Sequence, residues 1–294
     1  MISGYGLENL MLDEAELNQF TPIIPYYDHG WCLLDGMVQS VVDSPSGEYF
    51  AWNQRMMNMH KSLNKKIFIT GSPFVYFIDK YNIKKKKKKN TIFFLGHSTP
   101  NIRAIFNISK LLDDLNKLPD SLKPIDICLH YNDINLEKIF LENGFKVRCA
   151  GNIISNSFPK KFFEILADYN YSCSNILGTY VLYSLYIDIP FFLIGDEITY
   201  DNFGLDKNVP EKYKPLDSKT AQNIIHLFNK FNEKITSPQR KLIDYELGLK
   251  DKINKKDLKK IILKSLNNSL KNPLKIFPLV KSLGRTLVMK YKSF

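Results

Sequence analysis

The stretch TIFFLGHSTP, residues 91–100, joins an apolar, β-rich run to a turn of small and polar residues. We predict a strand over residues 91–95 and, from leucines at helical spacing, a helix over residues 108–118. Residues 125–130 form the next apolar run and are predicted to be a strand. A strand, a helix and a second strand in this order are typical of a parallel sheet with crossover helices.

The same alternation continues to residue 194. Further strands are predicted over residues 146–150, 171–173 and 191–194, and further helices over residues 136–143, 160–169 and 178–186. After a loop rich in turn residues, Ser218 is predicted to cap a helix that runs to residue 231. This part of the chain is therefore predicted to be a Rossmann-type α/β domain.

The regions on either side of this domain differ from it. Residues 49–52 and 66–70 are predicted strands around a helix at residues 54–63, which indicates a reduced N-terminal α/β domain. The polar segment 78–90 contains a run of six lysines and suits an interdomain connection. We therefore expect an N-terminal domain over residues 1–85, a C-terminal domain over residues 86–236 and a basic helical extension over residues 237–294.

The composition limits the class of protein. A chain of 294 residues, 44% of them hydrophobic, is long enough for two folded domains. Its formal net charge of +11 predicts attraction to an anionic partner, either nucleic acid, an anionic lipid or a phosphorylated substrate. No nucleic-acid-binding motif occurs, and the aromatic residues lie mainly in apolar runs, so nucleic acid is not the expected partner.

The sequence also favours the cytoplasm. Cys32, Cys128, Cys149 and Cys173 show no CxxC spacing, which is typical of reduced thiols in a cytosolic protein. No signal-peptide pattern and no apolar run of about 18 residues is present. We therefore expect neither secretion nor a membrane-spanning helix.

The most informative polar turn is SCSNILGT, residues 172–179, which lies where a predicted strand ends and a helix begins. A helix N-terminus offers free N–H groups and the positive end of its dipole to an anion. Ser174, Asn175, Gly178 and Thr179 are therefore candidate ligands of an anionic group such as a phosphate. Simple capping of the helix by a serine or asparagine, without a ligand, is the alternative.

A second polar turn holds Gly96, His97, Ser98 and Thr99 and follows the first strand of the same domain. Because ligands of doubly wound domains bind at the carboxyl ends of the strands, we expect both turns at one edge of the sheet. His97 can donate a hydrogen bond or a charge to a departing phosphate. The alternative is a histidine with a purely structural role.

Polar residues also follow two other predicted strands. Asn132 and Asp133 follow the second strand and can reach the base or ribose of a nucleotide, and the segment of residues 195–197 follows the fifth. The sequence contains no DxD arrangement and no His or Cys pair at ligand spacing. We therefore expect no metal and no cofactor.

The segment PYYDHGW, residues 25–31, is a candidate for acid–base chemistry. The carboxylate of Asp28 and the imidazole of His29 are adjacent in it and are followed by Gly30. Group transfer onto a hydroxyl needs a base that removes the hydroxyl proton, and either side chain can be that base. A turn capped by the aspartate is the alternative.

Together these segments resemble bacterial capsule and O-antigen glycosyltransferases of the GT-B type. The resemblance covers residues 25–195 and is carried by residues 28–31, 96–100, 128–134, 144–147, 174–175, 178–179 and 189–190. It implies a GT-B-like fold of two Rossmann-type domains. Within that class the layout is similar to enzymes that use CMP-activated keto sugars, which implies that His97 and Ser174 hold phosphate and that Asp28 or His29 is the base.

The implied function is transfer of a sugar from a nucleotide-activated donor, with a CMP-linked keto sugar favoured, to a saccharide or lipid-linked saccharide acceptor in surface polysaccharide biosynthesis. The reaction would be inverting and metal-independent. Two alternatives remain: a non-catalytic polysaccharide assembly or binding protein with a degenerate GT-B fold, and a phosphotransferase related to teichoic-acid polymerases.

The basic segment near the C-terminus carries Leu258, Ile261, Ile262 and Leu266 at helical spacing beside several lysines. Such a helix is typical of peripheral contact with an anionic membrane, here the inner face of the cytoplasmic membrane. Packing of the same apolar stripe on the body of the protein is the alternative.

Overall fold

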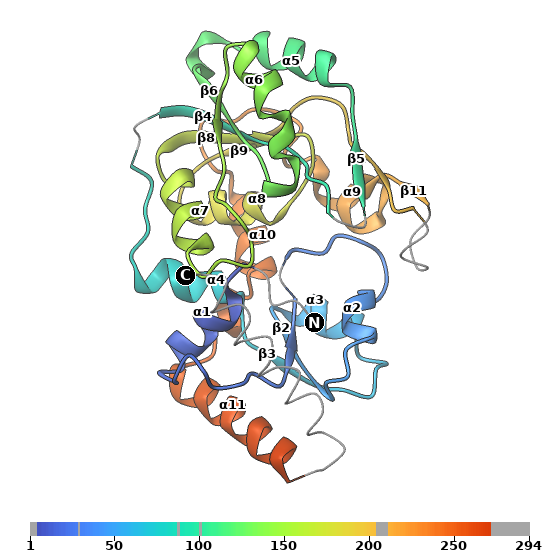
Figure 1. Ribbon diagram of the computed structural model, residues 1–294, viewed down its shortest axis with the longest axis vertical. Coiled ribbons are helices and arrows are strands. Elements are labelled where there is room, and N and C mark those ends of the chain that lie inside the picture. Colours follow the sequence, from blue (N-terminus) through green and yellow to red (C-terminus); the bar gives the residue numbers. More distant parts are fainter. Residues whose placement is uncertain (1–4, 29, 87–88, 100–101, 204–210, 272–294) are drawn as a thin grey trace.

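A computed structural model describes residues 5–28, 30–86, 89–99, 102–203 and 211–271 of the chain. The largest sheet among these residues has five parallel strands (Figure 1). The strands lie in the order β7-β6-β4-β8-β9. Their bounds are β4 Lys89–Phe94, β6 Ile125–Cys128, β7 Lys146–Arg148, β8 Tyr169–Ser174 and β9 Phe191–Leu193. The order reverses between β4 and β8, which gives the sheet a topological switch point at its centre.

Helices cover both faces of this sheet. The central strand β4 buries Ile92, Phe93 and Phe94, whose side chains alternate between the two faces. The helices α5 (Ile108–Asn116) and α6 (Glu137–Glu142) pack on the Phe93 face, and α7 (Phe158–Leu166) and α8 (Thr179–Tyr186) pack on the other. The domain is therefore doubly wound and Rossmann-like, which confirms the predicted α/β class with parallel sheets.

The N-terminal part has a smaller parallel sheet in the order β1-β2-β3. Its strands are β1 Tyr26–Tyr27, β2 Glu48–Ala51 and β3 Lys66–Ile69, and its helices are α1 Leu7–Glu14, α2 Gln39–Val42, α3 Gln54–Met59 and α4 Pro73–Lys80. The predicted boundary at residue 85 falls between α4 and β4. The three predicted domain ranges stay a proposal.

A third, antiparallel sheet lies in segments for which we predicted no strand. It has the order β11-β10-β5 and consists of β5 Arg103–Ile105, β10 Thr199–Asp201 and β11 Lys212–Tyr213. These strands have two or three residues each, and β5 pairs with a strand distant in sequence. The 3-10 helices are η1 Asp120–Leu122, η2 Tyr131–Leu136, η3 Pro215–Asp217 and η4 Leu249–Asp251.

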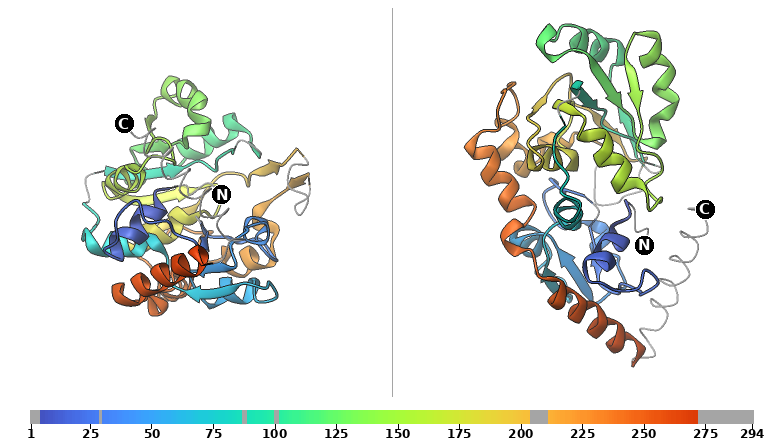
Figure 2. Two further views of the ribbon diagram at one scale, coloured as in Figure 1. Left: turned by 60° about the horizontal axis from the view of Figure 1, so that its bottom comes forward. Right: turned by 90° about the vertical axis from the view of Figure 1, so that its left-hand side faces the viewer.

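The last described helices return to the N-terminal part. They are α9 Lys219–Ile225, α10 Ser237–Glu246 and α11 Lys255–Leu270, and Figure 2 shows α11 beside α1. Leu258 and Ile262 are wholly buried and share a cluster with Met11, Leu12 and Phe50. For this pair of residues the packing alternative is confirmed. Among the described residues, no helix has both the length and the apolar character that crossing a bilayer requires.

A buried charge pair connects α10 to the N-terminal part. Glu246, at the end of α10, accepts hydrogen bonds from Arg55 Nη2 at 2.8 Å and from Trp31 Nε1 at 2.9 Å. The two charged side chains are only 6% and 19% exposed. Asn53 Nδ2 adds a bond to the Glu246 carbonyl oxygen at 2.8 Å. We call these four side chains the Glu246 cluster.

Several predicted helices end earlier than their sequence pattern indicated, including the helix over residues 54–63, which ends as α3 at Met59. At two of them a tertiary contact gives the reason. The predicted helix over residues 160–169 ends as α7 at Leu166, because Tyr169 already pairs with Lys89 in the sheet. The predicted helix to residue 231 ends as α9 at Ile225, because Phe228 is buried and its carbonyl oxygen accepts a bond from Leu193 N. Tertiary pairing overrides the local helical pattern at both places. The predicted cap by Ser218 is present and accepts a bond from Ala221 N at 3.0 Å.

Candidate functional site

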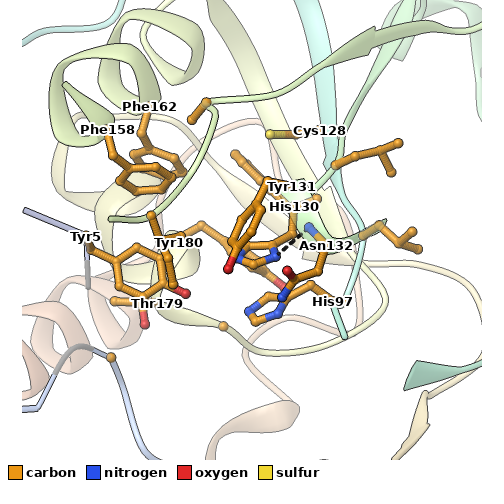
Figure 3. Close-up of a pocket in the computed structure, with 18 of the residues that line it drawn as sticks. Tyr5, His97, Cys128, His130, Tyr131, Asn132, Phe158, Phe162, Thr179 and Tyr180 are labelled. Carbon is orange, nitrogen blue, oxygen red and sulfur yellow. Dashed lines mark hydrogen bonds between the residues drawn. The ribbon is translucent and has the colours of Figure 1, made fainter. Parts of the chain in front are cut away.

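A cavity of about 440 Å³ lies at the carboxyl ends of β4, β6 and β8 (Figure 3). It is therefore at the switch point of the five-stranded sheet, where ligands of open α/β sheets bind. Residues of the N-terminal part, including Tyr5, Trp31 and Phe74, also line it. The cavity thus lies between the two α/β parts of the chain.

The predicted site residues divide into two groups. The cavity is lined by Gly96, His97, Thr99, Asn132, Gly178 and Thr179. Outside its lining lie Asp28, Ser98, Asp133, Ser174 and Asn175. His29 falls outside the described residues.

The turn after β4 is held against the turn after β8 by packing and by one hydrogen bond. Gly96 N donates to Asn175 Oδ1 at 3.1 Å. A Cβ at position 96 would lie 2.1 Å from Ile198 Cδ1 and 2.8 Å from Ile176 Cγ2. Close packing therefore explains the glycine, and Asn175 acts on the turn rather than on the cavity.

Ser98 and Asp133 fix the shape of the same turn. Ser98 N donates to Asp133 Oδ2 at 2.8 Å, and Asn132 Nδ2 donates to the Ser98 carbonyl oxygen at 3.1 Å. Asp133 is only 7% exposed. These residues position His97 and Thr99 at the cavity wall, and Asn132 also lines the cavity.

Two histidines lie face to face in the cavity wall. The rings of His97 and His130 are 4.2 Å apart between centroids, with 17° between their planes. His97 Nδ1 lies 3.1 Å from the Ser98 carbonyl oxygen, and Asn132 N donates to His130 Nδ1 at 3.3 Å. Burial lowers the pKa of His97, and burial together with the neighbouring His97 lowers the pKa of His130 to about 3. Both rings are therefore neutral at pH 7.

The hydroxyl groups of the serine-rich turn have partners within the protein. Ser174 Oγ is 2.6 Å from the Tyr180 hydroxyl and accepts a bond from Ile176 N at 3.1 Å. Thr179 Oγ1 accepts a bond from Trp31 N at 2.9 Å. Ser174 thus has the local structural role that the sequence left open, whereas Thr179 joins the start of α8 to the N-terminal wall.

The acid–base segment reaches the cavity through its last residues. Gly30 and Trp31 line the cavity, but Asp28 is buried beside β2, where it accepts a bond from the Tyr49 hydroxyl at 2.5 Å. Burial raises the pKa of Asp28 to about 6, and the bond from Tyr49 opposes this shift. Asp28 is a perturbed carboxyl, but its position does not bring it into the cavity.

The weaker candidates after β9 have other partners. Asp196 forms an exposed ion pair with Lys110 at 2.5 Å, and Glu197 accepts a bond from Leu216 N at 2.8 Å. Neither lines the cavity.

Most of the remaining wall is aromatic, and sequence reasoning did not select it. In Figure 3 the side chains of Tyr5, Phe158, Phe162 and Tyr180 gather at one side of the cavity, and His97, His130 and Asn132 lie at the other. None of the described residues that line it is Lys, Arg, Asp or Glu. The described wall thus combines an aromatic side with a side of neutral hydrogen-bonding groups.

Comparisons with known proteins give one distant structural likeness. No protein-family model and no curated protein matches the sequence. The structure is similar to one titled "Structure of the Wall Teichoic Acid Polymerase TagF, H548A", with a TM-score of 0.33 and 12% sequence identity. The match covers 77% of this chain and 60% of that chain. At so low a TM-score the likeness shows neither a family nor a function.

Proposed function

We propose that this chain is a glycosyltransferase that takes a sugar from a nucleotide-activated donor and transfers it to a saccharide acceptor in surface polysaccharide biosynthesis. The observation that carries the proposal is the position of the cavity. It opens at the switch point of a doubly wound sheet and is closed by a second α/β part. Its volume is within the range of pockets that enclose small ligands.

The aromatic side of the cavity suits the nucleoside. Tyr5, Phe162 and Tyr180 offer ring surfaces that a planar base can contact. The start of α8, at Gly178 and Thr179, also lines the cavity. A helix N-terminus stabilises a nearby phosphate through its N–H groups and dipole.

The described lining favours a donor with one phosphate charge. Its polar groups are neutral imidazoles, an amide, hydroxyls and backbone N–H groups. Neutral hydrogen-bond donors suit the single charge of a monophosphate better than the charges of a diphosphate, which cations usually balance. A CMP-linked keto sugar is therefore the favoured donor. We propose a direct, inverting displacement in which hydrogen-bond donors take the place of a metal.

We propose that the acceptor enters the cavity from the side of the N-terminal part. If the acceptor is a lipid-linked saccharide, it would bring the protein to the inner face of the cytoplasmic membrane. Lys256, Lys260 and Lys264 lie exposed on α11. Lysines near an anionic surface attract it. Leu258 and Ile262 are buried, so such contact would be electrostatic.

A nucleotide panel tests the proposal. Titration calorimetry and thermal shift with CMP, CDP, UDP and GDP should show selective binding of CMP. Asn132→Ala should weaken this binding, whereas Asn143→Ala should leave it unchanged. The two asparagines are matched, because each side chain donates one bond to a backbone oxygen but only Asn132 lines the cavity. No binding of any of the four nucleotides would contradict the proposal and favour the assembly-factor alternative.

A further inference from the structure

The hydrogen bonds of His97 and His130 fix opposite tautomers. A carbonyl oxygen only accepts, so the contact of His97 Nδ1 with the Ser98 oxygen places the proton on Nδ1 and leaves a lone pair on Nε2. His130 Nδ1 accepts from a backbone N–H, so its proton is on Nε2. Among the described residues, no atom pairs with His130 Nε2, although that nitrogen is buried.

The surroundings of the two rings keep both imidazoles neutral but allow one of them to become an imidazolium. Two charged imidazoles with centroids 4.2 Å apart would repel each other strongly. Asp133 is the carboxylate near His97 and favours its charged form, while Tyr131 packs on His130 at 4.6 Å between ring centroids. The pair is therefore suited to take up one proton, at His97.

We propose that His97 and His130 divide two roles in sugar transfer. His97 Nε2 is the base that receives the proton of the hydroxyl on the acceptor saccharide. His130 Nε2–H donates a hydrogen bond to a phosphate oxygen of the nucleotide-sugar. This assignment rests on the proposed function. It moves the base from Asp28 or His29 to a side chain in the cavity wall. It also gives the unpaired donor of His130 a partner when the anionic ligand arrives.

The proposed step conserves atoms and charge. The O–H bond of the acceptor breaks as its proton passes to His97 Nε2, and the oxygen forms a bond to the anomeric carbon of the donor sugar. The bond from that carbon to the phosphate oxygen breaks, and its electron pair leaves with CMP. The Ser98 carbonyl oxygen and Asp133, which are linked through Ser98 N, stabilise the imidazolium that forms.

Nitrogen-15 NMR of the imidazoles tests the pair without a substrate. The chain has five histidines, so the spectrum is simple to assign with single variants. At pH 7 we expect His97 protonated on Nδ1 and His130 on Nε2, both neutral. A proton on His97 Nε2, or a charged His97 at that pH, would overturn the proposal.

Binding and turnover separate the two roles. His130→Leu should weaken CMP binding about tenfold, the effect of one hydrogen bond to a charged group, and His130→Gln should recover part of the loss. His97→Gln should leave CMP affinity within about twofold but slow release of CMP from CMP-linked sialic acid at least a hundredfold, the scale of general base catalysis. His226→Gln, at an exposed position, should change neither.

Each outcome has one meaning. Unchanged turnover in His97→Gln, unchanged CMP affinity in His130→Leu, or a wild-type protein that binds the donor and never releases CMP contradicts the pair. Failure of the proposed function appears differently, as a wild-type protein that binds no nucleotide, whatever its tautomers. Circular dichroism of each variant checks that the fold is retained.

Discussion

Removal of the Glu246 carboxylate should weaken the attachment of α10 to the N-terminal part of the protein. The carboxylate accepts bonds from Arg55 Nε at 2.9 Å, from Arg55 Nη2 at 2.8 Å and from Trp31 Nε1 at 2.9 Å. In Glu246→Ala the Arg55 guanidinium keeps its bond to the Cys32 carbonyl oxygen but loses its counter-charge in a site that is only 19% exposed. The Trp31 N–H loses its acceptor as well.

The expected cost follows from what remains buried. Loss of one partner of a buried ion pair costs about 3–5 kcal/mol, because the remaining charge is desolvated and unpaired. Replacement of both partners by apolar residues, as in Arg55→Met with Glu246→Leu, should recover most of that cost. The coupling free energy between the two positions should therefore be at least about 2 kcal/mol.

Urea denaturation followed by tryptophan fluorescence measures these free energies of unfolding. Both tryptophans of the chain, Trp31 and Trp52, are buried residues of the N-terminal part, so the signal reports the part that is expected to loosen. The matched control is Glu142→Ala, which removes an exposed ion pair with Lys138 and should cost less than about 0.5 kcal/mol. A cost for Glu246→Ala as small as this control, or a coupling near zero, would refute the reasoning.

Three further predictions concern a turn, a buried acid and a surface. Gly248→Ala should destabilise the protein by about 3 kcal/mol or more in urea denaturation, because a Cβ there would lie 1.9 Å from the Trp52 carbonyl oxygen. The control Gly144→Ala has a similar positive φ but no atom within 4 Å of the new Cβ, so it should cost about 1–2 kcal/mol. Equal costs for the two variants would contradict the steric argument. Because the pKa of Asp28 is raised to about 6 in the folded protein, its contribution to stability should fall by about 2 kcal/mol as pH rises from about 4 to 6. Asp28→Asn should remove this slope, and parallel stability curves for the two proteins between pH 4 and 7 would contradict it. The protein should sediment with anionic vesicles at low salt and not at high salt, and equal binding to neutral vesicles would exclude an electrostatic contact through the α11 lysines.

The centre of the five-stranded sheet was predictable from the sequence because strands such as β4 and β6 are buried on both faces. Phe93 and Phe94 lie on opposite faces of β4 and are both buried, so the strand is a continuous apolar run. The meeting of the turns at Gly96 and Gly178 was predictable as well, because the carboxyl ends of parallel strands share one edge. The very short strands of the antiparallel sheet carry no such pattern.

The direction of individual side chains was not predictable. Ser174 Oγ bonds to the Tyr180 hydroxyl, so a residue selected for phosphate binding serves the local turn instead. Asp28 lies outside the cavity lining, and its carboxylate accepts a bond from the hydroxyl of Tyr49 on β2. Tyr5 reaches the cavity from a region far from the nucleotide-binding turns in sequence. Each of these outcomes depends on a tertiary contact that no local spacing encodes.

The contact between α1 and α11 sets an order of events during synthesis on the ribosome. Residues 89–193, which hold the five-stranded sheet, emerge as one continuous stretch and can fold soon after they leave the exit tunnel. Met11, Leu12 and Phe50 emerge earlier but share their cluster with Leu258 and Ile262. At about 5–20 residues per second, synthesis from residue 50 to residue 262 takes roughly 10–40 s. During that interval Met11, Leu12 and Phe50 lack their partners on α11, so these apolar side chains are less well covered in the nascent chain than in the complete protein.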